Sequence, residues 1–73
     1  MTTDASDNTL IVNGQVHSVP AAATVKALLD ELGMADQRLA VEVNEAVIPR
    51  SEYAATPLQA GDRVEVIRAI GGG

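Results

Sequence analysis

One short segment near the middle of the chain has the apolar spacing of a helix face, and it constrains the fold most. Its apolar residues recur at the i, i+3, i+4 and i+7 positions, namely Val25, Leu28, Leu29 and Leu32. Thr24 is a suitable N-cap, and Gly33 stands where a left-handed C-terminal cap is expected. A helix of about nine residues is too short to be stable alone in water. It must therefore pack this apolar face on another element, which the flanking segments predict to be a β-sheet.

An N-terminal β-hairpin is predicted before this helix. Residues 10–12 form a short apolar run, and residues 15–19 form the next strand-like segment. Asn13-Gly14 between them suits a type I′ turn, which requires a positive φ at both central residues. Pro20 is expected to end the second strand, because proline cannot donate a ladder hydrogen bond.

A second pair of strands is predicted after the helix. Residues 39–43 alternate apolar and polar side chains, as a half-buried strand does. After a turn at Asn44-Glu45, residues 46–48 predict a short edge strand that Pro49 stops.

The remaining segment is predicted to contain one helical turn and the last strand. Ser51 is expected to cap a turn over residues 51–54, and Leu58 is expected to be a core anchor on a loop. After a turn at residues 60–62, residues 63–70 predict the last strand. Its alternation places Val64 and Val66 on one face and Glu65, Ile67 and Ala69 on the other.

These elements predict an α+β fold in which a mixed sheet of four to five strands packs on one main helix. The two long terminal strands are expected to lie side by side, joined by a right-handed crossover. Residues 1–8 are polar and acidic, and we expect them to form a disordered lead-in. Residues 9–70 are expected to form the domain, and residues 71–73 a flexible glycine tail.

The charge of the chain narrows the classes of partner. Ten acidic residues against five basic ones give a net charge of -5, and an acidic surface repels the phosphates of nucleic acids. A partner with a basic docking face fits this charge better. No apolar run has the length of a membrane span, and residues 1–8 lack the features of a signal peptide. We therefore expect a cytoplasmic protein that binds neither nucleic acid nor membranes.

The sequence offers little catalytic chemistry. It has no cysteine, so neither a disulfide nor a thiolate metal site can form. His17 is the only histidine and has no evident acidic partner, so we interpret it as an ordinary surface residue. Asp30 and Glu31 are adjacent on the helix and point in different directions. The glycines outside the C-terminal run have the spacing of turns and caps rather than of a phosphate loop, namely Gly14, Gly33 and Gly61. We therefore expect neither an enzyme nor a metal site.

The C-terminal end is the unusual chemical feature. The last strand leads directly into Gly71, Gly72 and Gly73. Because glycine has no Cβ, such a segment is thin enough to enter a narrow channel in another protein. Its reactive group would be the carboxylate of Gly73, which must be activated, for example as an acyl adenylate, before a sulfur or nitrogen nucleophile can attack it.

Over about residues 10–73 the chain resembles the ThiS family of ubiquitin-like sulfur carriers. The matching segments are LIVNG (10–14), TVKALL (24–29), LAVEVN (39–44), VIPR (47–50), LQAGD (58–62), VEVI (64–67) and IGGG (70–73). The resemblance implies a ubiquitin-like β-grasp fold. Residues 44–50 and the compact length are closer to ThiS than to its molybdopterin-pathway relative, MoaD. Gly72 and Gly73 match the terminal pair of the family, and Gly71 extends it.

The resemblance also implies a reaction cycle and its partners. A ThiF-like activating enzyme would use ATP to adenylate Gly73, and a persulfide donor would convert the adenylate to a thiocarboxylate. A ThiG-like thiazole synthase would then take the sulfur for thiamine biosynthesis. Gly71 and Gly72 would thread into the active site of the partner. The carrier itself is expected to hold no cofactor and to be a monomer when free.

A docking patch is predicted next to this C-terminal end. Ile67 and Ala69 are expected on the sheet face away from the helix, with Arg68 and Ile70 adjacent. Ile67 could equally be a half-exposed strand residue without a docking role. The alternatives for function are a carrier of the same type for molybdopterin, cysteine or a secondary metabolite, a ubiquitin-like modifier that joins Gly73 to a lysine, and a binding module with inert glycines.

Overall fold

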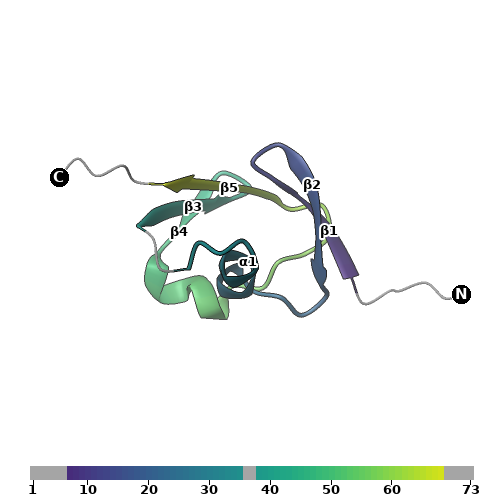
Figure 1. Ribbon diagram of the computed structural model, residues 1–73, viewed down its shortest axis with the longest axis horizontal. Coiled ribbons are helices and arrows are strands. Elements are labelled where there is room, and N and C mark those ends of the chain that lie inside the picture. The colour runs from purple at the N-terminus through teal and green to yellow at the C-terminus, as the bar shows by residue number, and fades with distance from the viewer. Residues whose placement is uncertain (1–6, 36–37, 69–73) are drawn as a thin grey trace, which may run out of the picture.

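Five strands form one mixed sheet, and an α-helix packs across one face of it (Figure 1). The computed structural model describes residues 7–35 and 38–68 of the chain. In chain order, the elements are β1 (Asp7–Val12), β2 (Gln15–Pro20), α1 (Val25–Glu31), β3 (Leu39–Val43), β4 (Ala46–Ile48), the 3-10 helix η1 (Arg50–Ala55) and β5 (Arg63–Arg68).

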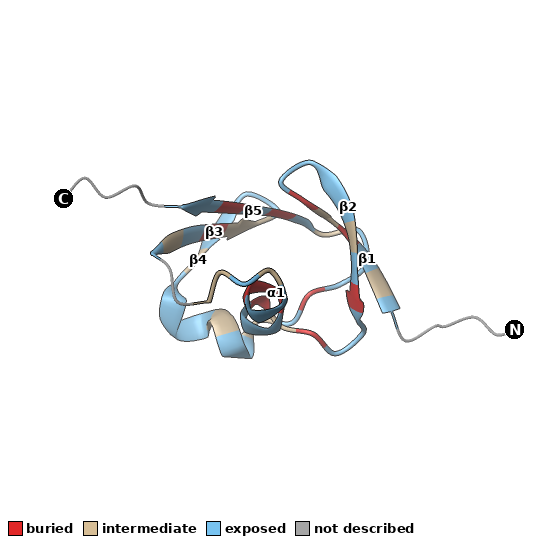
Figure 2. Ribbon diagram, in the orientation of Figure 1, coloured by how far each residue is buried: buried red, intermediate tan, exposed pale blue. Residues whose placement is uncertain are grey.

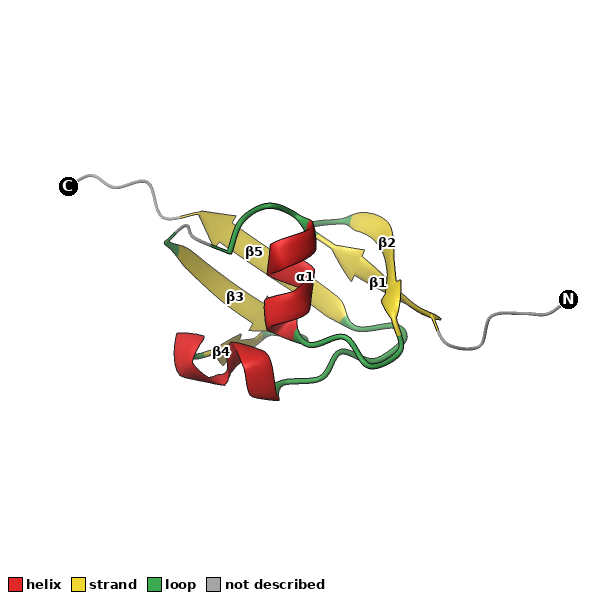
Figure 3. Cartoon of the chain, turned by 60° about the horizontal axis from the view of Figure 1, so that its bottom comes forward, coloured by secondary structure: helices red, strands yellow, loops and turns green. Residues whose placement is uncertain are grey.

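The strand order across the sheet is β2-β1-β5-β3-β4. β1 and β5 are parallel, whereas the other neighbouring strands are antiparallel. The first and last strands therefore lie side by side in the sheet, as the sequence predicted. The helix α1 crosses one face of this sheet (Figure 3). A mixed sheet of this order with a helix on one face is the β-grasp fold, so the predicted fold class is confirmed.

Aliphatic side chains fill the space between the sheet and α1, where the buried residues gather (Figure 2). The largest fully buried side chains come from strands, helix and loop alike: Leu10, Val19, Val25, Leu28, Leu29, Val41, Leu58 and Val64. Tyr53 packs against this core from η1. A domain this small buries only about 60% of the surface that its unfolded chain exposes. Each large core side chain therefore carries a large share of the stability.

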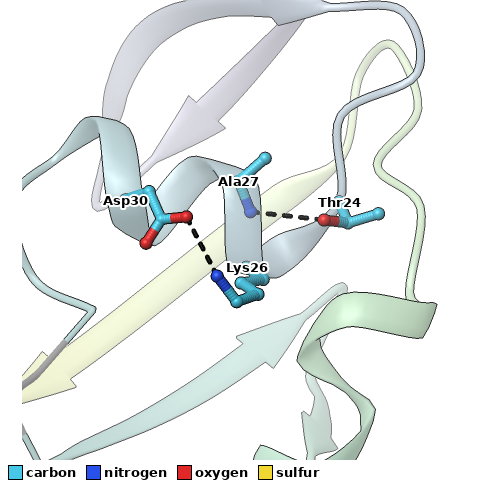
Figure 4. Close-up of polar contacts among 4 residues, drawn as sticks. All are labelled: Thr24, Lys26, Ala27 and Asp30. Carbon is cyan, nitrogen blue, oxygen red and sulfur yellow. Dashed lines mark hydrogen bonds and ion pairs between the residues drawn. The ribbon is translucent and has the colours of Figure 1, made fainter.

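The N-terminal end of α1 is stabilised by side chains on its own surface (Figure 4). Thr24 Oγ1 accepts a hydrogen bond from the backbone N–H of Ala27 at 3.2 Å, which confirms the predicted N-cap. Lys26 lies in the first turn, and its Nζ is 3.2 Å from Oδ2 of Asp30, four residues further along the helix. Such contacts support a helix of only seven residues.

The C-terminal end of α1 is closed by backbone hydrogen bonds around Gly33. Gly33 has a φ of 73°, which the absence of a Cβ allows at little cost. Its N–H donates to the carbonyl of Asp30, and the N–H of Met34 donates to the carbonyl of Leu29. This pair of bonds is the Schellman motif, and it confirms the predicted cap. Leu32 is the C-cap residue and packs, partly buried, against the core.

The predicted helical turn after Pro49 is present, but its start differs from the prediction. η1 begins at Arg50, with Pro49 as its N-cap and no side-chain capping bond, so the predicted Ser51 cap was wrong. The backbone closes the first turn instead, because the N–H of Glu52 donates to the Pro49 carbonyl at 2.8 Å.

The start of the domain also differs from the prediction. β1 begins at Asp7, so Asp7 and Asn8 belong to the sheet and not to the expected lead-in of residues 1–8. They pair with Pro20 and Val19 of β2. Asn8 is held further by its side chain, since Nδ2 donates to the carbonyl of Leu58 at 3.1 Å. This long-range hydrogen bond helps to hold polar Asn8 in the sheet, and the hydrophobic pattern of the sequence gives no sign of it.

Leu58→Ala is expected to lower the free energy of unfolding by about 2–4 kcal/mol. Leu58 is 1% exposed and anchors the loop between η1 and β5 in the core. Urea unfolding followed by circular dichroism measures the loss. Val47→Ala is the control, because Val47 is 69% exposed and its truncation is expected to cost less than about 0.5 kcal/mol. Equal losses for the two variants would contradict the role given to Leu58.

Candidate functional site

β5 is the strand that leads toward the C-terminal glycines, and it is hydrogen-bonded between two neighbours. It pairs in parallel with β1 at Ile11↔Arg63 and Val12↔Val64. On its other side it pairs antiparallel with β3, from Val43↔Val64 to Leu39↔Arg68. The alternation predicted for this strand is confirmed, because Val64 and Val66 are buried while Glu65 and Ile67 are exposed.

Where β1 ends, the side chain of Asn13 takes over as a partner of β5. Asn13 occupies the β1–β2 turn with a φ of 51°. Its Oδ1 accepts a hydrogen bond from Val66 N at 2.8 Å, and its Nδ2 donates to Val66 O at 3.3 Å. The side-chain amide thus satisfies both backbone groups of Val66, as a peptide group of a neighbouring strand would.

Asn44, in the turn between β3 and β4, holds the start of β5 in a related way. Asn44 and Glu45 have φ values of 52° and 72°. Asn44 Oδ1 accepts a hydrogen bond from Arg63 N at 3.0 Å, and the backbone N–H of Asn44 donates to Arg63 O at 2.7 Å. Asn44 Nδ2 also donates to Asp62 Oδ1 at 3.0 Å.

Sequence reasoning assigned these two asparagines to turns only and missed their contact with β5. Each occupies the first position of a two-residue turn whose preceding strand neighbours β5. The sequence signal was therefore present, but it could be used only once the strand order was known. Together, Asn13 and Asn44 fix β5 from both sides.

Two of the predicted docking residues lie on opposite faces of β5. Ile67 is 53% exposed and pairs with the exposed Ala40, on the face away from α1. Arg68 pairs with Leu39, which packs against the core, so Arg68 shares the helix-side face. The predicted placement of Ile67 is confirmed, whereas Arg68 does not extend the same surface. The other predicted site residues lie outside the described residues: Ala69, Ile70, Gly71, Gly72 and Gly73.

The sheet face away from α1 carries three exposed large apolar side chains, Val16, Val47 and Ile67. They are separated on this face. Val16 and Val47 lie on the two edge strands, whereas Ile67 lies on the central β5. Glu42 and Glu65 pair with each other between Val47 and the rest of the face. The apolar surface at Ile67 is therefore small and has acidic neighbours.

His17 has surroundings that the sequence did not predict. Its side chain is 29% exposed, and Nε2 lies 3.7 Å from Glu31 Oε1, so the expectation of no acidic partner was wrong. The fold explains the contact, because β2 places His17 on the face that α1 covers.

Within residues 7–35 and 38–68, no group of three or more histidine, cysteine or acidic side chains could hold a metal ion. No helix in those ranges is long and apolar enough to cross a membrane.

A β-grasp domain whose central strand leads into a run of glycines has the architecture of a ubiquitin-like carrier protein. The family model of the ThiS family matches residues 10–73. The chain belongs to the ThiS family.

Two relatives have nearly the same length as this chain. The sulfur carrier protein ThiS of Escherichia coli (strain K12) is 30% identical over 64 residues, which is 88% of this chain and 97% of the relative. The crystal structure of the thiamine biosynthesis protein (ThiS) from Geobacter metallireducens superposes with a TM-score of 0.76 and 35% identity. That match covers 89% of this chain and 99% of the other.

Other relatives are much longer. A thiazole synthase of Paramagnetospirillum magneticum is 42% identical over 64 residues, which is 88% of this chain but 20% of the relative. A thiazole synthase of Magnetococcus marinus is 45% identical over 62 residues, or 19% of its length. The chain thus spans about one fifth of the length of these relatives.

Asn13→Gly is expected to lower the free energy of unfolding by about 1–2 kcal/mol. Glycine accepts the positive φ of the turn, so the substitution removes the side-chain bonds and retains the turn. Amide hydrogen exchange should show that the N–H of Val66 loses protection. Asn44→Gly is the matched control, because it removes bonds at Arg63 and should leave the exchange of Val66 nearly unchanged. Equal protection of Val66 in wild type and Asn13→Gly would contradict the role of Asn13.

Proposed function

We propose that this chain carries sulfur for thiazole formation in thiamine biosynthesis and is not itself an enzyme. The observation that carries the proposal is the match to the ThiS family, which runs through β5 as far as Gly73. The relatives named thiazole synthase support thiazole formation over molybdopterin, cysteine or secondary-metabolite pathways. They also support a ThiG-like synthase as one partner.

The proposed chemistry occurs at the carboxylate of Gly73. In a ThiF-like enzyme, a carboxylate oxygen attacks the α-phosphorus of ATP, and pyrophosphate leaves. The persulfide of a donor protein attacks the resulting acyl adenylate and displaces AMP, and a thiol then cleaves the sulfur–sulfur bond to leave a thiocarboxylate. The synthase takes the sulfur, and the carboxylate is restored. Because the chain has no cysteine, it offers no thiol of its own that could attack the activated carbonyl.

The structure supports this role through the way it holds β5. Val64 and Val66 lie in the core, and the two asparagine side chains bind the backbone of the strand. Because β5 is already ordered, a partner that docks on it loses less conformational entropy than it would on ordering a loose strand. The glycines that follow have no side chains to obstruct entry into a narrow active site. We propose that the cycle runs in the cytoplasm and that the free carrier is a monomer.

The first test is the intact mass of the chain after incubation with ATP, a ThiF-like enzyme and a persulfide donor. We expect an adduct in which sulfur replaces one oxygen and which an alkylating reagent modifies at Gly73. Oxidation of Met1 or Met34 adds nearly the same mass but creates no group that is alkylated in this way.

A variant without Gly72 and Gly73 is the control for this test. It should form no adduct while retaining the urea midpoint of the intact chain, because the described core is built from residues between Leu10 and Val66. Conjugates with other proteins, formed through an amide to lysine, would indicate a ubiquitin-like modifier instead. Unchanged mass with an active enzyme and a folded chain would contradict carrier chemistry.

A second test concerns the small apolar surface at Ile67. Ile67→Asp is expected to reduce kcat/KM for adenylation by roughly 5- to 100-fold, the range for loss of a central interface contact. Val16→Asp is the matched control, because Val16 is 71% exposed on the same face but on the edge strand β2. Urea unfolding verifies that both variants fold. Equal kinetics for Ile67→Asp and wild type would exclude Ile67 from the docking surface.

A further inference from the structure

A groove lies beside the free part of β3, between that strand and η1. β4 pairs only with Val41–Val43 of β3, so Leu39 and Ala40 have no strand beyond them on that side. Two adjoining cavities of about 270 and 260 Å³ occupy this region and share Ala35, Arg50 and Tyr53 as lining residues. We call the two cavities together the β3–η1 groove. Figure 3 shows η1 beside β4 at this side of the molecule.

The β3–η1 groove concentrates the positive charge of an acidic chain. Three of the five basic residues line it, namely Lys26, Arg38 and Arg50. None of its described lining residues is acidic. Lys26 is paired with Asp30, whereas the described residues place no carboxylate within ion-pair distance of Arg38 or Arg50. Asp36 and Gln37, which follow Ala35 in the chain, lie outside the described residues.

The walls between these charges are largely apolar. Leu39 and Tyr53 line the first cavity, and Leu29 lines the second. Tyr53 and Leu39 are only partly buried, so a ligand can still remove apolar surface from water there. Two apolar cavities in a row with arginines at their borders suit a chain segment that alternates apolar side chains with carboxylates. A small anion would use the charges but leave the apolar walls uncovered.

We propose that the β3–η1 groove binds an acidic peptide segment of a partner protein, anchored by apolar side chains. Arg38 and Arg50 would bind its carboxylates, and its apolar side chains would fill the cavities beside Tyr53. The first cavity is also lined by Ile67, so the bound segment would also contact β5. The proposal concerns recognition by the folded domain and does not depend on the chemistry of Gly73.

The test is a titration of the ¹⁵N-labelled full chain, followed by NMR, with a ten-residue synthetic peptide in which glutamate and leucine alternate. Saturable shifts are expected for the amides of residues 38–39 and 50–54, with a Kd on the order of 1 mM, as for a small interface. A peptide with glutamine in place of glutamate is expected to bind at least about fivefold more weakly, because it lacks the charges that face the arginines.

Arg50→Glu is the matched variant and is expected to weaken binding of the glutamate peptide roughly 5- to 10-fold. Arg63→Glu is its control, because Arg63 is exposed at the start of β5 and does not line the groove. It should therefore leave the Kd nearly unchanged. Urea unfolding checks the fold of each variant, and Arg50→Gln replaces Arg50→Glu if the charge reversal destabilises the domain.

Three outcomes would overturn the proposal. The first is equal binding of the glutamate and glutamine peptides. The second is a set of shifts confined to the sheet face around Val16 on the edge strand β2, which would indicate a different surface. The third is movement of the same groove amides when the protein concentration alone is raised, which would show that a second copy of the chain occupies the groove.

Discussion

The hydrogen bonding of β5 on both of its sides is the interaction on which the rest of the structure depends. β5 is the only strand here that joins segments from both halves of the described sequence: it pairs with β1 from the N-terminal hairpin and with β3 from the second. Without β5, the two hairpins would be separate two-stranded units, and such hairpins are marginal in water. Its inward side chains, Val64 and Val66, then contribute to the surface on which α1 packs. The short helix and the strand therefore stabilise each other.

Much of this architecture was predictable because it depends on local patterns. Apolar spacing predicted α1, alternation predicted β3 and β5, and the Asn13-Gly14 pair predicted the first hairpin. The long-range hydrogen bonds were not predictable in the same way. Asn13 binds a residue 53 positions away, and Asn8 binds one 50 positions away. An asparagine looks the same in the sequence whether it only forms a turn or also makes a long-range hydrogen bond. Its partner can therefore be identified only after the topology is known.

The candidate site was predictable to a different degree. The exposure of Ile67 followed from the period of a strand, which alternates its side chains between two faces. The same period places Arg68 on the other face. The predicted docking patch nevertheless grouped Arg68 with Ile67, because the two residues are adjacent in the sequence. The β3–η1 groove was not predictable, because Lys26, Arg38 and Arg50 come from a helix, a loop and a 3-10 helix. Their proximity results from the packing of η1 against α1.

A carrier that passes between enzymes must bind each of them well enough to react and weakly enough to leave. Under the proposed docking at Ile67, the small apolar surface there would give a weak complex that dissociates quickly, because affinity differences between related complexes are mostly differences in dissociation rate. The position of Ile67 adds a second consequence, since it lines the first cavity of the groove and is also exposed on the outer sheet face. A partner docked on that face at Ile67 and a peptide in the groove would therefore compete for one side chain. Competition of this kind would make successive encounters exclusive and would favour release of one partner before the next one binds.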